Sequence, residues 1–310
     1  MTKKYDFAFT WLLNLVLAFL IYLNAEAGRL LGIKSLALNF SAVWPATGFS
    51  LAALLIFGFK MWPGILLGNL SYNFLHLYGA GQDLLHTSLA ATCISLGSLA
   101  QALVGGFVMR KYATSGYLTT MKDVVLFLLF GGSITCFIAS SIGVSTLYAI
   151  GELSAENIPL TWLTFWLGDT MGIFIFTPLI VVWALQKPDT RLWFFSWENL
   201  CMLLLFAAIG YFTLQGYPLG YLFIPYSIWV AYRFSFHGVT LAILFITFFI
   251  IVPIATGAGP FIVNFTAEML LIIVSFLEII ASTALLFAAV TSERNAAWQL
   301  IKKHRLDLIS

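Results

Sequence analysis

Ionisable side chains inside long apolar stretches are the residues of this sequence most able to do chemistry. Asp169 is the clearest, in Trp166-Leu167-Gly168-Asp169-Thr170-Met171-Gly172, and Glu278 lies within the last apolar stretch. Charged groups in a bilayer are costly and mark functional sites by default. We predict a ligand-binding or switch site that includes Trp166, Asp169, Thr170 and Glu278. The alternative is a structural carboxylate hydrogen-bonded between packed helices.

A second set of polar side chains falls on one face of a helix. Asn69 and Asn73 are one i,i+4 step apart, and His76 follows three residues later. We predict that these three side chains also contribute to ligand binding or switching. Hydrogen bonding between helices is the alternative, and a metal site of His76 with His86 would lack the other usual ligands.

Two residues near a helix start complete the predicted site. Trp44 and Thr47 belong to Val43-Trp44-Pro45-Ala46-Thr47-Gly48, where a proline early in a helix removes a donor that had no partner. We expect Asn69, Asn73 and Asp169 to face a common cavity with Trp44 at its mouth.

No motif in the sequence indicates enzymatic chemistry. A nucleophile–base pair, a Walker loop, a zinc motif and a dinucleotide fingerprint are all absent, so we predict no catalytic residue, no metal and no cofactor. The net charge of +2 comes without a basic block, so no nucleic-acid partner is expected. Cys93, Cys136 and Cys201 lie in apolar runs and are expected to be inert small hydrophobes.

Composition indicates a membrane protein. Hydrophobic residues make up 61% of the 310 residues and charged residues 9%, whereas soluble domains carry roughly 25% charged residues. Because a span needs about 20 apolar residues, the sequence predicts an all-α transmembrane bundle of about ten spans, or eight if two short segments are re-entrant or lie at the surface. The spans are 6–27, 40–59, 62–78, 84–109, 122–150, 160–186, 195–215, 217–233, 236–256 and 264–291.

The positive charges orient this bundle. With ten spans, all of the 15 lysines and arginines except Arg29 and Lys34 lie on the side of the two termini. Since positive charge concentrates in cytoplasmic loops, both termini are predicted to be cytoplasmic. The first apolar stretch is long for a signal peptide and is predicted to be an uncleaved span.

The C-terminal segment differs from the rest of the chain. Residues 292–310 are polar and helix-forming, so we divide the chain into a membrane domain, 1–291, and a cytoplasmic linker helix. Val290, Ala297, Ile301 and Leu308 form a short heptad seam that favours a homodimer, with a plain amphipathic surface helix as the alternative. A helix that leaves the last span in this way is expected to lead to a further domain.

Several short motifs, in order along the chain, together resemble the MASE1 domain, a bacterial membrane-associated sensor module. They are Val43 to Gly48, Trp62-Pro63-Gly64 with Gly68-Asn69, Trp166 to Asp169 with Gly172 and Pro178, Pro225 to Trp229 with Arg233-Phe234 and Gly238, Gly259-Pro260-Phe261, and Glu293-Arg294. The resemblance implies about eight spans, fewer than counted here. It also implies a cytoplasmic histidine kinase, diguanylate cyclase or phosphodiesterase domain as the output.

These observations predict a sensory module of the bacterial inner membrane. An unknown small-molecule or membrane-protein signal would shift the bundle, and the last span would pass the shift through Glu293 and Arg294 to the output domain. A transporter or substrate-binding membrane component is the alternative, although the two halves show no convincing repeat. A scaffold that only anchors and dimerises the output enzyme is the third possibility.

The predicted orientation can be tested by labelling. A cysteine introduced at Ser154, in the loop after the fifth predicted span, should react with a membrane-impermeant thiol reagent from the periplasmic side. Labelling of this position from the cytoplasmic side alone would exclude the predicted topology.

Overall fold

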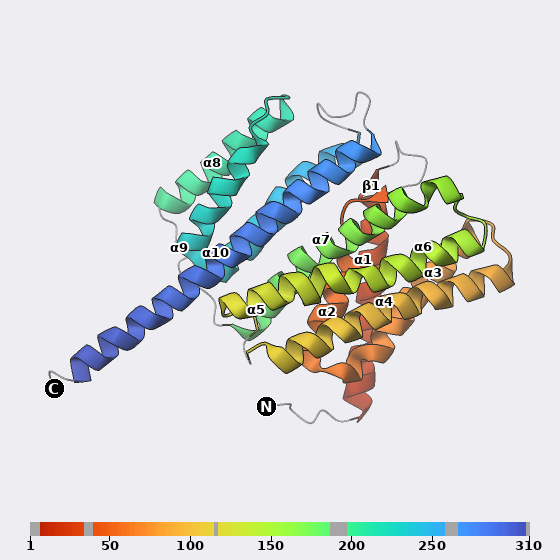
Figure 1. Cartoon of the computed structure of the whole chain (residues 1–310), viewed down its shortest axis with the longest axis horizontal. Helices are drawn as coiled ribbons and strands as arrows, with labels where there is room; N and C mark the ends of the chain where they lie inside the picture. The colour runs from red at the N-terminus through yellow and green to blue at the C-terminus, as the bar shows by residue number, and fades with distance from the viewer. Residues whose placement is uncertain (1–6, 34–39, 115–116, 187–196, 258–265, 308–310) are drawn as a thin grey trace.

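The computed structural model is almost entirely helical (Figure 1) and describes residues 7–33, 40–114, 117–186, 197–257 and 266–307. The α-helices are α1 Phe7–Leu30, α2 Pro45–Phe57, α3 Trp62–Gly79, α4 Leu84–Tyr112, α5 Met121–Leu126, α6 Ile134–Ala149, α7 Ile158–Leu185, α8 Trp197–Leu214, α9 Phe223–Ala255 and α10 Ala267–Asp307. Shorter elements are the antiparallel pair β1 Gly32–Ile33 and β2 Phe40–Ser41, the 3₁₀ turns η1 Phe59–Met61, η3 Ala155–Asn157 and η5 Gly220–Leu222, and the π-helix η2 Phe127–Ser133.

Seven described helical stretches are long and apolar enough to cross a membrane: Phe7–Leu30, Leu84–Tyr112, Met121–Ala149, Ala155–Leu185, Trp197–Leu214, Gly220–Ala255 and Glu268–Asp307. The predicted all-helical, multi-pass membrane architecture is therefore confirmed. The apolar helix α2 is shorter, and α3 is not among the seven. The number of crossings stays a prediction. The Gly259-Pro260-Phe261 motif and Leu308 lie outside the described residues.

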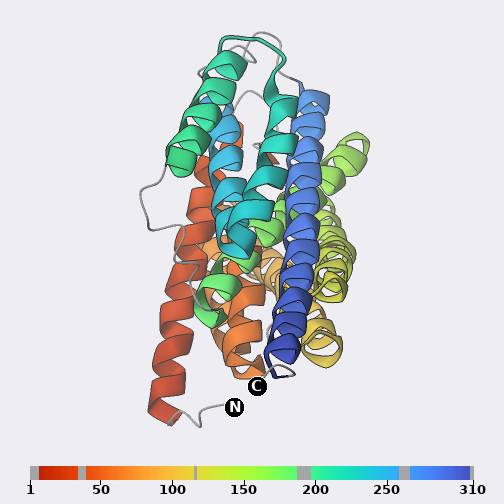
Figure 2. The same cartoon turned by 90° about the vertical axis from the view of Figure 1, so that its left-hand side faces the viewer.

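Helix α9 is interrupted by a sharp turn at Ser235, whose φ of 52° and ψ of −152° are not helical. A Cβ added to Gly238 would lie 3.2 Å from Val230 Cγ1. In a straight helix, eight residues would separate these positions by about 12 Å along the axis. The chain therefore folds back, and the two halves of α9 lie side by side (Figure 2). This turn falls between the predicted spans 217–233 and 236–256.

Helices α2 and α7 pack with their backbones in close contact. A Cβ added to Gly172 would lie 1.9 Å from the Trp44 carbonyl oxygen, and one added to Gly48 would lie 2.3 Å from the Gly172 carbonyl oxygen. Two hydrogen bonds join the same surfaces, from the Trp44 N–H to the Gly168 carbonyl at 2.9 Å and from Thr177 Oγ1 to the Gly48 carbonyl at 3.0 Å. Small residues at such contacts let helices approach closely in membranes.

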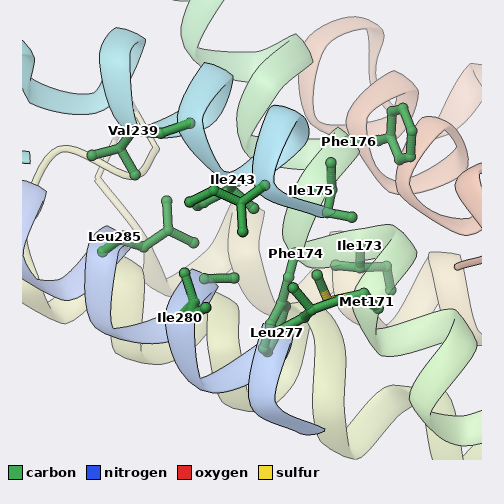
Figure 3. Packing of buried hydrophobic residues seen from close by; sticks show 14 of the residues in the cluster. Met171, Ile173, Phe174, Ile175, Phe176, Val239, Ile243, Leu277, Ile280 and Leu285 are labelled. Atoms are coloured by element: carbon green, nitrogen blue, oxygen red, sulfur yellow. The ribbon is translucent and has the colours of Figure 1, made fainter. Parts of the chain in front are cut away.

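The apolar core lies where α7, α9 and α10 meet. Figure 3 shows side chains of the three helices converging there, among them Phe174, Ile243 and Leu277. Helix α10 continues past this core as one unbroken helix, as expected from a sequence without glycine or proline. Its C-terminal part extends beyond the other helices (Figure 1), and it ends at the same end of the bundle where α1 begins (Figure 2).

The α2–α7 contact predicts the effect of adding one methyl group. Gly172→Ala should lower the melting temperature of the detergent-solubilised protein, because overpacking a tight contact costs about 1–3 kcal/mol. Gly143→Ala is the matched control, since its added Cβ would meet only the Phe165 ring at 3.6 Å. Equal melting temperatures for the two variants would contradict the close packing of α2 on α7.

Candidate functional site

Trp44 connects the α3 part of the predicted site to helix α7. Its backbone N–H is bonded to Gly168, and its ring meets the edge of Tyr72 at 5.5 Å between centroids. Tyr72 in turn stacks on His76 at 5.6 Å with an angle of 7° between the rings. Thr47 donates to the backbone carbonyls of Trp44 and Asp169, at 2.8 and 3.1 Å. These residues form a continuous contact from α3 through the start of α2 to α7.

The side-chain amides of the two asparagines of α3 each donate one hydrogen bond, one within α3 and one to α4. Asn69 Nδ2 donates to the Ile65 carbonyl on its own helix at 2.9 Å, and Asn73 Nδ2 donates to Ser95 Oγ on α4 at 3.1 Å. Among the described residues neither amide is bonded to Asp169. A groove of about 480 Å³ opens between α3 and α4, lined by Leu70, Ser71, Phe74, Leu75, Ser88 and Thr92. The common cavity of Asn69, Asn73 and Asp169 stays a prediction.

A polar cluster from four helices surrounds the thiol of Cys136 on α6. Gln101 Nε2 of α4 donates to Cys136 Sγ at 3.2 Å. The Thr170 side chain of α7 lies beside this thiol, and the carboxyls of Asp169 and Glu278 lie within electrostatic range of it. Gln101, Cys136 and Thr170 are at most 2% exposed. The three predicted residues Asp169, Thr170 and Glu278 therefore lie in the same region of the bundle as this buried thiol.

Several oxygens in this region have no hydrogen-bond partner. Gln101 Oε1, Glu278 Oε1 and Ser140 Oγ are buried and unpartnered. Ser140 follows Cys136 by one helical turn, so both side chains lie on the same face of α6. In the part of the chain that the structure describes, no basic side chain pairs with Asp169 or Glu278. Unsatisfied buried polar atoms are rare in native proteins and call for an explanation.

Immediately before Cys136, the chain forms the π-helix η2. A π-helix leaves carbonyls without their usual partners and occurs frequently at functional sites. Trp166 Nε1 of α7 donates to the Ser133 carbonyl at 2.8 Å, and Thr135 Oγ1 donates to the carbonyls of Gly131 and Gly132, each at 3.1 Å. The predicted site residue Trp166 is thus a partner of the π-helix. Its ring stacks on Phe137 at 5.3 Å between centroids.

The two predicted output residues contact the bundle where α10 leaves it. Glu293 Oε1 accepts from the backbone N–H of Met121, the first residue of α5, at 2.9 Å. The Arg294 guanidinium lies 5.1 Å from the centroid of the Tyr232 ring on α9. Glu293 and Arg294 therefore tie α10 to α5 and α9 at this end of the bundle.

Sequence reasoning missed Cys136 and the π-helix. A buried free cysteine is common in apolar cores, so its sequence context carried no signal for the polar cluster. The adjacent glycines Gly131 and Gly132, inside a predicted span, were the available hint of irregular backbone. No three His, Cys, Asp or Glu side chains among the described residues are grouped to hold a metal ion.

The role of Trp166 can be separated from the general stability of the aromatic stack. Trp166→Phe should destabilise the protein by about 1–3 kcal/mol, since the Ser133 carbonyl would lose its donor. Trp162→Phe is the control, because the Trp162 ring belongs to the same stack but donates to the exposed Ser141 hydroxyl. Melting temperatures in detergent should fall further for Trp166→Phe. A larger loss for the control would contradict this role.

Comparison with known proteins agrees with this architecture. The family model described as MASE1 matches residues 15–295, nearly the whole chain. No curated protein and no solved structure gives a significant match. MASE1 is a membrane-associated sensor module of signalling proteins and is not itself catalytic. This membrane-spanning chain, with its polar cluster inside a helix bundle and its long last helix, belongs to the MASE1 family.

Proposed function

We propose that this chain is the sensory input module of a signalling protein in the bacterial inner membrane. The bundle, residues 1–291, receives a small-molecule or membrane-protein signal. Residues 292–310 carry it to a cytoplasmic histidine kinase, diguanylate cyclase or phosphodiesterase domain. The observation that supports this most directly is α10, one uninterrupted helix of 41 residues that contains both Glu278 and Glu293.

The topology we propose has ten spans and cytoplasmic termini. The described chain has ten helical segments that could form these spans. They are the seven long apolar helices, with α9 counted as two because a turn divides it, and the short helices α2 and α3. The start of α1 and the end of α10 at the same end of the bundle (Figure 2) support an even number of crossings. The distribution of lysine and arginine supports the cytoplasm as the side of that end.

Transmission depends on the stiffness of α10. A helix without a hinge moves as a unit, so a displacement near Glu278 reaches the segment beyond Arg294. That segment exposes Trp298, Leu300 and Ile301, at 64%, 70% and 55%. The exposed side chains support the proposal that two copies pair through this helix, along the seam of Ala297 and Ile301.

In the full-length protein, Glu278→Gln and Asp169→Asn should shift output activity while the amount of folded protein stays the same. A carboxylate that leaves its polar surroundings for lipid costs at least about 2.5 kcal/mol on insertion scales, which changes a two-state ratio more than about tenfold. The experiment compares each variant's output with its detergent melting temperature.

Glu268→Gln is the control for this experiment, because Glu268 is an exposed carboxylate on the same helix. Its output should match that of the unchanged protein. If the output of all three variants simply follows the amount of folded protein, Asp169 and Glu278 are packing residues and the proposed switch is wrong.

A further inference from the structure

We propose that Glu278 is a proton-binding site inside the bundle and that a proton is the ligand to which this module responds. The inference rests on the sensory function proposed above and names its ligand. Three observations carry it: the unpartnered oxygens around Cys136, the lack of an opposite charge, and the position of Glu278 on the helix that leads to the output.

Two buried acceptor oxygens near Cys136, one on Gln101 and one on Glu278, have no donor. The Gln101 side chain is 2% exposed, its Nε2 donates to Cys136, and its Oε1 has no partner. Glu278 Oε1 has no partner either. An ionised carboxylate and an amide oxygen can only accept, whereas a protonated carboxyl donates one hydrogen bond. A proton on Glu278 therefore removes the charge and gives this carboxyl a hydrogen bond to donate.

The surrounding helices bring no positive charge to Glu278. Helices α5, α7 and α9 contact α10, and α6 carries Cys136. Their charged or titratable side chains are Lys122, Asp123, Cys136, Tyr148, Asp169, Tyr226, Tyr232, Arg233 and His237. Only Cys136 has a described interaction with Glu278. Arg233 pairs with Glu198 at 2.6 Å, and Asp123 accepts from the Thr114 N–H at 2.8 Å. A negative charge on Glu278 would thus lie unpaired in the membrane, so neutralisation by a proton is strongly favoured.

The available ligands argue for a proton over a metal cation. A metal cation needs a shell of several oxygen ligands, and no three His, Cys, Asp or Glu side chains among the described residues are grouped to hold one. A proton needs no such shell. Loss of the proton would leave a carboxylate that must recruit water or move, and movement of Glu278 is movement of α10.

Infrared difference spectroscopy tests the site directly. The 310-residue protein, in lipid nanodiscs, is measured at two pH values with unlabelled and with ¹³C-labelled glutamate. We expect the C=O band of a protonated carboxyl that shifts on glutamate labelling. The band should disappear in Glu278→Gln and remain in Glu268→Gln. Labelling needs no substitution, so the test stands even where Glu278→Gln fails to fold.

The outcomes separate this site from the proposed function. No glutamate-sensitive band in the labelled wild-type protein would overturn the proton site and leave the sensory role intact. A band that responds to replacing choline with sodium at constant pH would also overturn it, in favour of a metal cation. Output of the full-length protein should follow the titration of the band. The ratio of protonated to ionised carboxyl changes about tenfold for each pH unit. If the output does not change with pH while the band titrates, the proton is not the signal.

Discussion

The interior of a bilayer supplies no water, so each polar group there must find its partner within the protein. Many serine and threonine hydroxyl groups in the described residues satisfy the requirement locally, by donating to a carbonyl one turn back on their own helix. Examples are Ser50, Ser71, Ser88, Thr92, Thr146 and Thr213. Polar groups that bond across helices are therefore informative, because they mark the contacts that hold the bundle in register. Thr177 to Gly48, Asn73 to Ser95 and Trp166 to Ser133 are such contacts.

The same requirement explains why irregular backbone occurs where it does. The π-helix η2 lies against α4, α6 and α7, and its carbonyls receive hydrogen bonds from Trp166 and Thr135. Non-helical backbone is tolerated at membrane depth only where protein or water covers it. The unpartnered oxygens of Gln101, Ser140 and Glu278 are among the exceptions to this rule. They belong to the region that we propose as the site of the signal.

Those features of the fold that depend on a single helix could be predicted from the sequence. Long apolar runs gave the helices, and the absence of glycine and proline gave the unbroken α10. The spacing of Gly168 and Gly172 indicated a close helix contact, which the structure shows to be with α2. The partner itself could not be predicted, because it depends on tertiary packing. The turn at Ser235 falls at the predicted boundary between spans 217–233 and 236–256. The π-helix could not be predicted, because a glycine pair inside an apolar run does not specify such geometry alone.

The candidate site shows the same division between local and tertiary information. Asp169 and Glu278 stood out because carboxyl groups are expensive in lipid. Cys136 and its bond to Gln101 did not, although they bring the two carboxyls to one place. Their arrangement has a mechanical consequence. The same number of residues separates Glu278 from Glu293 on α10 and Met121 from Cys136 on the neighbouring segment.

Helix α10 and the α5–η2–α6 segment thus interact at two places, through the electrostatic interaction of Glu278 with Cys136 and through the hydrogen bond of Glu293 to Met121. Between Met121 and Cys136 the α5–η2–α6 segment contains the π-helix η2, whereas α10 is a continuous helix between Glu278 and Glu293. A regular helix transmits displacement, whereas a π-helix can change its local hydrogen bonding. We therefore propose that a change of the interaction at Cys136 deforms η2 while α10 shifts as a whole. In this proposal the Glu293–Met121 bond and the packing of Arg294 on Tyr232 decide how much of that shift leaves the membrane.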